Sequence, residues 1–159
     1  MPRTSLQLAL TSLGTSHDDM LHLCDQLETI ADSLPANVDR QQCLHVARAV
    51  CRTVAEAHRL EEAVLFPALE PLSTTLKTMP ATLDRLRYEH NEDMCFAEEL
   101  ADTLLAIGKG ETSLSGDAAG YMLRGFFESV RRHIAFEREL LTPLLEMSWS
   151  TVPEPRAVA

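Results

Sequence analysis

The stretch CRTVAEAHRLEEAVLFPAL, from Cys51 to Leu69, carries apolar residues at three- and four-residue intervals and therefore predicts an amphipathic helix. In such a helix His58 and Glu62 lie one turn apart on the same face. A carboxylate is costly to bury among apolar side chains unless a partner compensates its charge, and a metal ion is one such partner. The stretch thus predicts a helix whose buried, otherwise apolar face carries a histidine and a carboxylate. The other residues of that face are Cys51, Val54, Leu65 and Leu69.

The same helical spacing runs through almost the whole chain, and no alternating pattern predicts a strand. Prolines and a polar loop at residues 108–117 separate the helical stretches. Long helices with short connections favour an all-α fold, an antiparallel up-down-up-down four-helix bundle. We expect one domain over residues 1–149 and a flexible tail over 150–159. The predicted helices cover residues 5–34, 39–70, 82–107 and 118–147.

The composition restricts the partners of this protein. The 159 residues include 24 acidic and 14 basic side chains, for a net charge of -10. An acidic surface argues against binding to a nucleic-acid backbone or to an anionic membrane. The chain shows no signal peptide, no transmembrane stretch and no CxxC pair among its four cysteines, so we expect a cytoplasmic protein with reduced thiols. The sequence does not indicate an oligomeric state.

Each predicted helix places one histidine on its apolar face, whereas His22 and His45 lie about 140° away from those faces. The last helix also repeats the spacing of four between a histidine and a glutamate. Four imidazoles and two carboxylates would be costly in an apolar interior without a compensating ion. We therefore predict a metal site whose ligands are His17, His58, Glu62, His90, His133 and Glu137.

The donor set limits the choice of metal. Carboxylates can bridge, so four histidines and two glutamates suit two ions better than one, and mixed imidazole and carboxylate ligation suits iron, manganese or zinc. Ferritin-like di-iron proteins carry Glu-x-x-His on two helices. No glutamate precedes an inward histidine by three residues here, which disfavours that family. The residues at those positions are Gly14, Ala55, Arg87 and Val130.

The order of these residues resembles the hemerythrin-like, or HHE cation-binding, domain family in its H-HxxxE-H-HxxxE form. The resemblance spans Ser16 to Leu145 and includes the segments HRLEEAVLFPAL and HIAFERELLTPLL. It implies an oxo- or hydroxo-bridged pair of non-haem iron ions inside an antiparallel four-helix bundle. It also implies that the four histidines are terminal ligands and that Glu62 and Glu137 bridge the ions.

One departure bears on function. Met94 stands where the oxygen-carrying hemerythrins have a further histidine, which would leave a coordination position open to water or to a carboxylate from Glu61, Glu89 or Asp93. Reversible oxygen carriage is therefore not expected. The resemblance favours a protein that binds or senses oxygen, nitric oxide or iron. The alternative is a redox enzyme that removes peroxide or nitric oxide, or that supplies iron for repair of damaged iron centres. Iron storage is disfavoured because ferritin-type motifs are missing.

Overall fold

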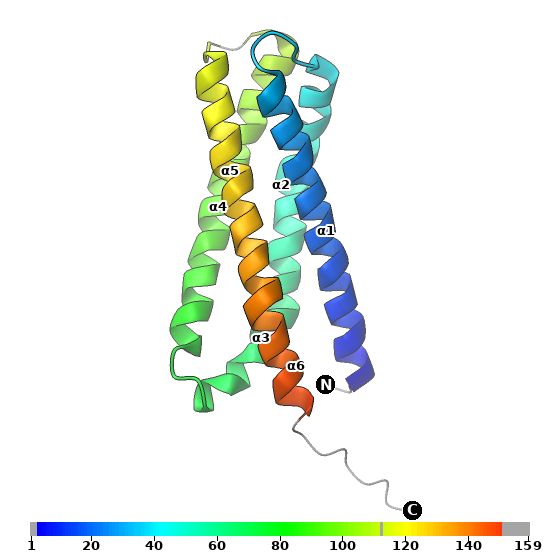
Figure 1. The fold of residues 1–159 in the computed structure, drawn as a ribbon, viewed down its shortest axis with the longest axis vertical. Coiled ribbons are helices and arrows are strands. Elements are labelled where there is room, and N and C mark those ends of the chain that lie inside the picture. The colour runs from blue at the N-terminus through cyan, green and yellow to red at the C-terminus, as the bar shows by residue number, and fades with distance from the viewer. Residues whose placement is uncertain (1–2, 112, 151–159) are drawn as a thin grey trace, which may run out of the picture.

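The computed structural model describes residues 3–111 and 113–150, and all secondary structure in this part of the chain is helical. Four long helices pack together, and the colour gradient in Figure 1 shows that the chain runs alternately up and down through them. The prediction of an all-α four-helix bundle is confirmed. When the shorter segments that continue α2 and α5 are included, the predicted helix ends lie within four residues of the observed ends. The long helices are α1 (Arg3–Ser33), α2 (Arg40–Leu60), α4 (Met79–Lys109) and α5 (Gly116–Phe136).

Two of these helices change their winding near one end and then continue. A π-helical segment, η1 (Glu61–Leu65), follows α2 directly, and a second one, η3 (Glu137–Leu141), follows α5. Each π segment begins six residues before a proline, Pro67 or Pro143. A proline cannot donate the α-helical hydrogen bond and its ring crowds the carbonyl four residues earlier, so a wider turn accommodates it. The continuing segments are α3 (Phe66–Leu69), the 3-10 segment η2 (Glu70–Thr74) and α6 (Thr142–Ser150).

Local side chains set the helix boundaries at the opposite end of the bundle. The Asp39 carboxylate accepts hydrogen bonds from two backbone N–H groups of the first turn of α2, and the Ser115 hydroxyl accepts one at the start of α5. Gly110 ends α4 in the left-handed conformation, with φ of 75°. These caps fix the connections that a short-loop bundle requires.

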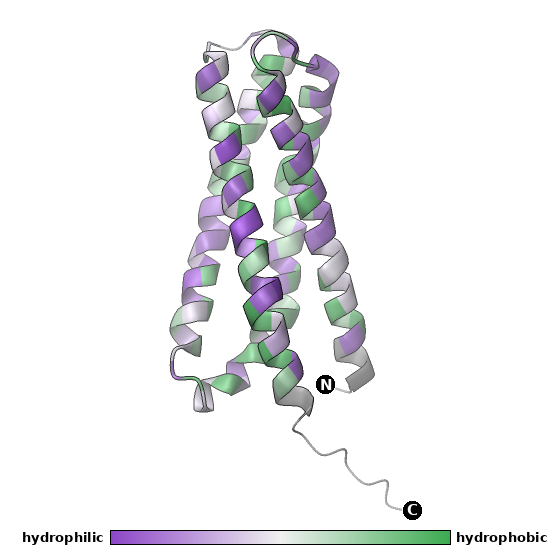
Figure 2. Ribbon diagram, in the orientation of Figure 1, coloured by the Kyte–Doolittle hydropathy of each residue, from purple (hydrophilic) through white to green (hydrophobic). Residues whose placement is uncertain are grey.

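The interior is divided into two hydrophobic clusters. Hydrophobic and hydrophilic residues are interspersed along each of the four long helices (Figure 2), so each of these helices can bury one face. The upper cluster includes Leu27, Val50 and Phe126, and the lower cluster includes Phe66 and Leu83. Along each long helix the two clusters are separated by buried ionisable residues, so a polar layer crosses the bundle between them.

Two further predictions concern the membrane and the tail. Within residues 3–111 and 113–150, no helix combines the length and the apolar character needed to cross a membrane. Ser150 is the last residue of α6. The flexible tail predicted over residues 150–159 otherwise lies outside the described residues.

Candidate metal centre

Four histidines enter the polar layer, one from each long helix. His17, His58, His90 and His133 are each at most 7% exposed. The rings of His58 and His90 stack with centroids 4.0 Å apart, and the His133 ring centroid lies 5.2 Å from that of His90. The prediction that these four histidines face the core is confirmed.

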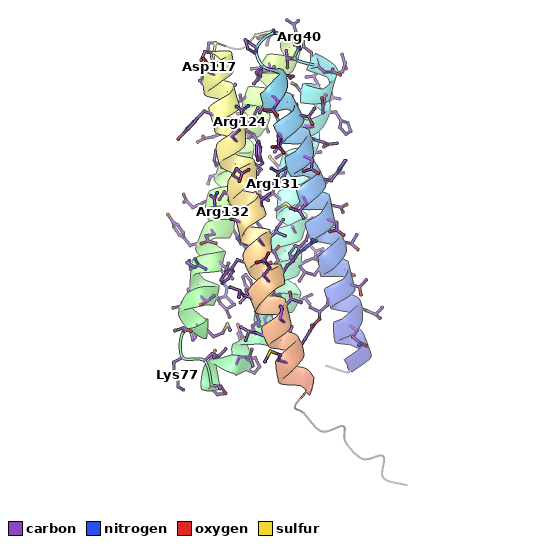
Figure 3. All side chains as sticks on the ribbon, viewed as in Figure 1. Arg40, Lys77, Asp117, Arg124, Arg131 and Arg132 are labelled. Carbon is purple, nitrogen blue, oxygen red and sulfur yellow. The ribbon has the colours of Figure 1, made fainter. Side chains whose placement is uncertain are left out.

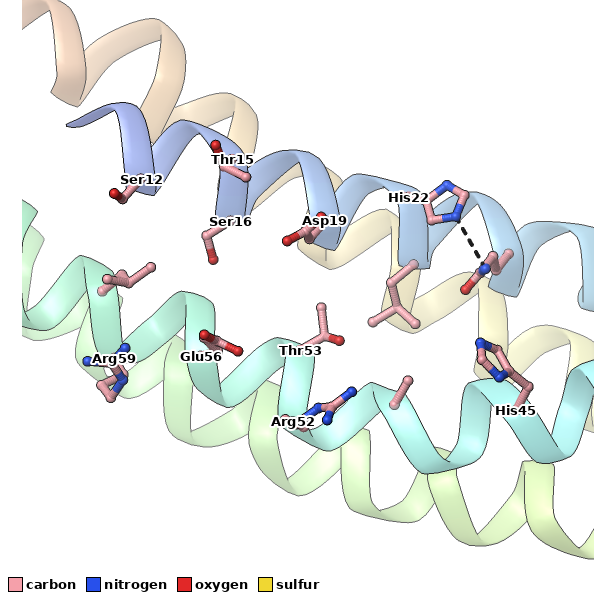
Figure 4. Close-up of a pocket in the computed structure, with 14 residues that line it drawn as sticks. Ser12, Thr15, Ser16, Asp19, His22, His45, Arg52, Thr53, Glu56 and Arg59 are labelled. Atoms are coloured by element: carbon pink, nitrogen blue, oxygen red, sulfur yellow. Dashed lines mark hydrogen bonds between the residues drawn. The ribbon is translucent and has the colours of Figure 1, made fainter. Parts of the chain in front are cut away.

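The predicted surface histidines lie elsewhere. His22 and His45 are exposed and line a cavity of about 730 Å³ between α1 and α2 (Figure 4). Apart from the polar layer, the described residues form no group of three or more histidine, cysteine, aspartate or glutamate ligands. The two facing predictions, inward and outward, therefore agree with the structure for all six histidines.

The carboxylates of the layer differ from the prediction in one helix. Glu137 is fully buried, as predicted. Glu62, however, has a side chain that is 47% exposed, and its neighbour Glu61 is fully buried in its place. The prediction that Glu62 faces the core is therefore wrong. In an α-helix the residues three and four positions after His58 lie on either side of its direction, so a small change of winding decides between them.

The sequence contains a signal that Glu61, and not Glu62, is the buried acid. The wide turn of η1 begins at Glu61, and that of η3 begins at Glu137. Counted back from Pro67 and from Pro143, these two glutamates occupy the same position, six residues earlier. Counted forward from the two histidines, the spacings are three and four. The proline, rather than the histidine, is the reference point that identifies the buried acid.

Four side chains of the layer converge closely enough to hold one ion together. One ligand atom from each of Glu61, His90, His133 and Glu137 lies within 4.8 Å of the other three. His17 lies beside this group, with Nε2 at 3.0 Å from Glu61 Oε1 and 3.1 Å from Glu137 Oε2. Five of the six buried histidines and glutamates thus lie around the two carboxylates of Glu61 and Glu137.

His58 stands slightly apart from the carboxylate pair. It stacks on His90, and its Nε2 lies 3.8 Å from Oδ2 of Asp93. Asp93 is itself only 7% exposed. Glu61, Glu89 and Asp93, the three acids named as alternatives for an open coordination position, therefore all contact histidines of the layer.

Two carboxylates orient histidines from outside the layer. Nδ1 of His90 donates to Glu62 Oε1 at 2.8 Å, and Nδ1 of His133 donates to Glu89 Oε2 at 3.3 Å. In the neutral form of either ring, a proton held on Nδ1 leaves the lone pair on Nε2, which points into the layer. Carboxylates commonly support metal-ligating histidines in this manner. Glu62 therefore contacts the site although it is not buried in it.

His17 has a different neighbour. Arg138 donates from Nε to His17 Nδ1 at 3.3 Å and from Nη2 to Asp18 Oδ1 at 2.7 Å and to the Gly14 carbonyl at 3.0 Å. With Nδ1 accepting, the His17 proton sits on Nε2 and is donated to Glu61. His17 consequently links α1 to the buried acid by a hydrogen bond in this arrangement.

The electrostatics separate the histidines. Burial, together with the nearby His90, lowers the pKa of His58 to about 3, so this ring is neutral at pH 7. Burial also opposes charge on His133, but the Glu137 and Glu61 carboxylates raise its pKa to about 10. Burial alone would raise the pKa of Glu61, yet the imidazoles of His133, His17 and His90 lower it overall. The layer therefore holds an ionised carboxylate beside a neutral imidazole.

The cysteines lie outside this chemistry. Cys24 and Cys43 belong to the upper hydrophobic cluster, Cys51 packs against it, and Cys95 is exposed. Burial raises the pKa of Cys24 to about 12, so its thiol stays protonated.

Unsatisfied polar atoms test whether the residues fit a metal. Seven buried side-chain atoms of the described residues lack a hydrogen bond of good geometry, and all seven belong to the layer. Six of them still lie 3.0–3.8 Å from a carboxylate or imidazole atom of a neighbouring side chain. Buried polar groups are normally paired, and leaving one unpaired costs about 1–3 kcal/mol. Imidazole nitrogens and carboxylate oxygens are the donors that iron, manganese and zinc accept, so the residues fit a metal centre. The atoms are both ring nitrogens of His58, Nε2 of His90 and His133, Oε2 of Glu61 and both carboxylate oxygens of Glu137.

Comparison with known proteins agrees with this site. The family model of the hemerythrin HHE cation-binding domain matches residues 9–145. No curated protein and no solved structure matches the chain. The match includes all of the polar layer and most of the bundle. The chain belongs to the hemerythrin HHE cation-binding domain family.

Proposed function

We propose that this protein holds two iron ions in the polar layer and there binds a small ligand, either a diatomic molecule such as oxygen or nitric oxide or a peroxide. The observation that supports the proposal is the set of seven buried donor atoms without a hydrogen bond of good geometry, which come from α2, η1, α4, α5 and η3 and meet at one level. Imidazole–carboxylate contacts at 3.0–3.8 Å satisfy these groups only in part, so the layer is costly to bury without an ion. A metal centre would satisfy them together.

The proposed ligands follow the buried donors. Glu61 takes the bridging position that the resemblance gave to Glu62, because Glu61 is the fully buried acid of its segment, and Glu137 is the second bridging carboxylate. Two central carboxylates that each serve two ions favour a pair of ions over a single one. Manganese or zinc would suit the same donors. The proposed terminal ligands are His17, His58, His90 and His133.

The chain itself supplies orientation, exclusion of water and a proton. Bound iron would supply the redox and ligand-binding chemistry. Glu62 and Glu89 hold the rings of His90 and His133 with Nε2 inward. Hydrophobic clusters on both sides of the layer keep bulk water out. Burial raises the pKa of Asp93, so its carboxyl group can hold a proton beside Nε2 of His58 at a higher pH than an exposed aspartate.

Anaerobic loading with iron(II) tests the proposal. We expect about two irons per chain, and near-ultraviolet absorption bands after exposure to oxygen. Glu137→Ala should abolish two-metal occupancy, whereas His22→Ala and His45→Ala, on the exposed helix faces, should leave it unchanged. Absence of bound metal after anaerobic loading of the wild-type chain would overturn the proposal.

The same preparation distinguishes binding from turnover. If peroxide added to the iron-loaded protein is consumed over many cycles, the protein is a redox enzyme, which is the alternative function. If peroxide reacts once per site and then stops, ligand binding or sensing is favoured. Either result leaves the metal assignment intact, because it is measured separately.

A further inference from the structure

A second cavity opens on the surface beside the polar layer. It lies between α4 and α5, has a volume of about 420 Å³, and is lined by Asp93. Asp93 also belongs to the layer, since its carboxylate lies 3.8 Å from His58 Nε2. One side chain therefore borders both the surface cavity and the buried histidines.

The cavity has an excess of negative charge. Glu92 and Glu99 line it together with Asp93, against the single guanidinium of Arg132. None of Glu92, Glu99 and Arg132 forms an ion pair with another described residue, and all three are exposed. Arg132 projects from the α4 side of α5, whereas Arg131 lies on the α1 side (Figure 3). A concave surface with this charge concentrates cations.

Small side chains keep the cavity open. Gly125 and Ser129 lie one turn apart on α5 and both line it. A Cβ atom at Gly125 would lie 3.6 Å from the ring of Phe96, which is ordinary van der Waals contact, so a larger side chain there would fill the space. Behind Asp93, both nitrogens of His58 are buried and have no hydrogen-bond partner. Asp93 thus stands between the cavity and a buried imidazole that a metal ion could use.

The cavity between α1 and α2 does not share this chemistry (Figure 4). Its acids, Asp19 and Glu56, are matched in number by Arg52 and Arg59. It therefore offers no net charge to attract a cation, and it provides a matched control.

We propose that the cavity between α4 and α5 is the entry route of the metal ion into the polar layer. Glu92 and Glu99 attract a divalent cation, and Asp93 transfers it from the cavity to His58. This inference rests on the proposed metal-binding function, but it concerns the rate of loading rather than the final occupancy.

The rate of Co²⁺ uptake by the metal-free protein tests the route. Co²⁺ serves as an optical probe, mixed rapidly with protein at low ionic strength. The double variant Glu92→Gln with Glu99→Gln should load about tenfold more slowly, with unchanged final occupancy. Asp93→Asn should also load more slowly. Arg132→Gln should load faster, by about threefold, because it removes the one repelling charge.

The control is the double variant Asp19→Asn with Glu56→Gln, which should load at the wild-type rate. Salt should reduce the differences, because it screens exposed charges. Unchanged loading rates in both the Glu92/Glu99 and the Arg132 variants would overturn the route while leaving the metal site in place. If the wild-type chain takes up no Co²⁺ and no iron, the proposed function itself fails. Ser129→Leu, which narrows the cavity without changing charge, should slow loading at every salt concentration.

Discussion

Two segments of the bundle, His58–Pro67 and His133–Pro143, are near-copies that differ where the chemistry lies. Each contains a histidine, a fully buried glutamate, a π turn and a proline, in that order. The residue after the buried glutamate is acidic in the first segment, Glu62, and basic in the second, Arg138. The pKa values of the two histidines are also shifted in opposite directions from the ordinary 6.5, to about 3 for His58 and to about 10 for His133.

The difference between the segments shows what determines the buried acid. The distance from acid to proline is the same in both segments, and the distance from histidine to acid is not. A proline fixes where the helix must widen, and the widening fixes which side chain turns inward. The spacing from the histidine can differ between the segments, because the positions three and four residues after it both lie close to its face of the helix.

The largest expected effect on metal binding comes from removing, one at a time, the two acids of the first segment. Glu61→Ala should abolish two-metal binding, because it removes a fully buried donor. Glu62→Ala should only weaken binding, by about 10- to 100-fold, because Glu62 orients His90 from outside the layer. Metal content after anaerobic loading and titration calorimetry measure both. A greater loss in Glu62→Ala than in Glu61→Ala would restore the spacing-of-four assignment.

The two histidines should have opposite effects on the stability of the metal-free protein. His58→Leu should raise the free energy of unfolding by about 2 kcal/mol, since it removes a buried ring whose nitrogens are both unpaired. His133→Leu should lower it, because Glu61 and Glu137 would lose a cationic partner. Urea unfolding at pH 7 of both variants measures the difference.

The pH dependence has the same origin. His58 has a folded pKa of about 3, below the ordinary 6.5, so the unfolded chain binds more protons between these values and stability rises with pH across that window. His133 has a folded pKa of about 10, so the folded chain binds more protons from 6.5 to 10 and stability falls as pH rises. The metal-free protein should therefore be most stable near pH 6.5. The His58→Leu variant should lose only the part of the acidic dependence that comes from His58, because Glu61, whose pKa is also lowered, still destabilises the folded chain in acid.

Removal of the prolines should affect the two segments unequally. Pro143→Ala restores a backbone donor and favours α-helical winding in place of the π turn that begins at Glu137, which shifts that carboxylate and should lower metal affinity about tenfold. Pro67→Ala should lower metal affinity less. Glu62 stands next to Glu61 and can replace it if the winding changes, whereas the residue next to Glu137 is Arg138, which cannot bind a metal ion. Circular dichroism should show that both variants remain helical. Equal losses in the two variants would contradict the proline-based account.

The smallest effect is expected at Arg138. Arg138→Gln removes hydrogen bonds to His17 and to the Gly14 carbonyl and should lower the free energy of unfolding by about 1 kcal/mol. Asp18→Asn is the matched control, because it loses the exposed ion pair but keeps the contact of Arg138 with His17. If both variants lose the same amount, the contact with His17 contributes nothing.

Much of the fold could be predicted from the sequence because helical periodicity persists over whole helices and capping residues mark their ends. The facing of each histidine could be predicted for the same reason. The prediction of facing failed inside the π turns, at Glu62 in η1 and at Leu140 in η3. Leu140, which the regular spacing from His133 places on the inner face, is 53% exposed, whereas Leu141 is 2% exposed. Periodicity assumes constant winding, so a wide turn displaces some positions inside it, although Leu65 and Leu69 are buried as the spacing from His58 predicts.

The ion-pairing partners could not be predicted at all. Arg138 contacts residues of α1 that are 120 or more positions away in sequence, and Glu89 contacts His133 on another helix. Such contacts depend on how the helices are rotated against one another, which residue spacing within one helix does not determine.

Compared with a regular α-helix, each π turn contains one extra residue, and a sequence alignment does not show where that residue lies. A search pattern fixed to a histidine and to the fourth residue after it accepts Glu62 and Glu137 as equivalent, although only one of the two is buried. An alignment anchored at the prolines pairs Glu61 with Glu137 without any insertion. An alignment anchored at the prolines would group relatives by the acid inside the bundle. A pattern anchored at the histidines would group them by an acid that is half exposed in the first segment.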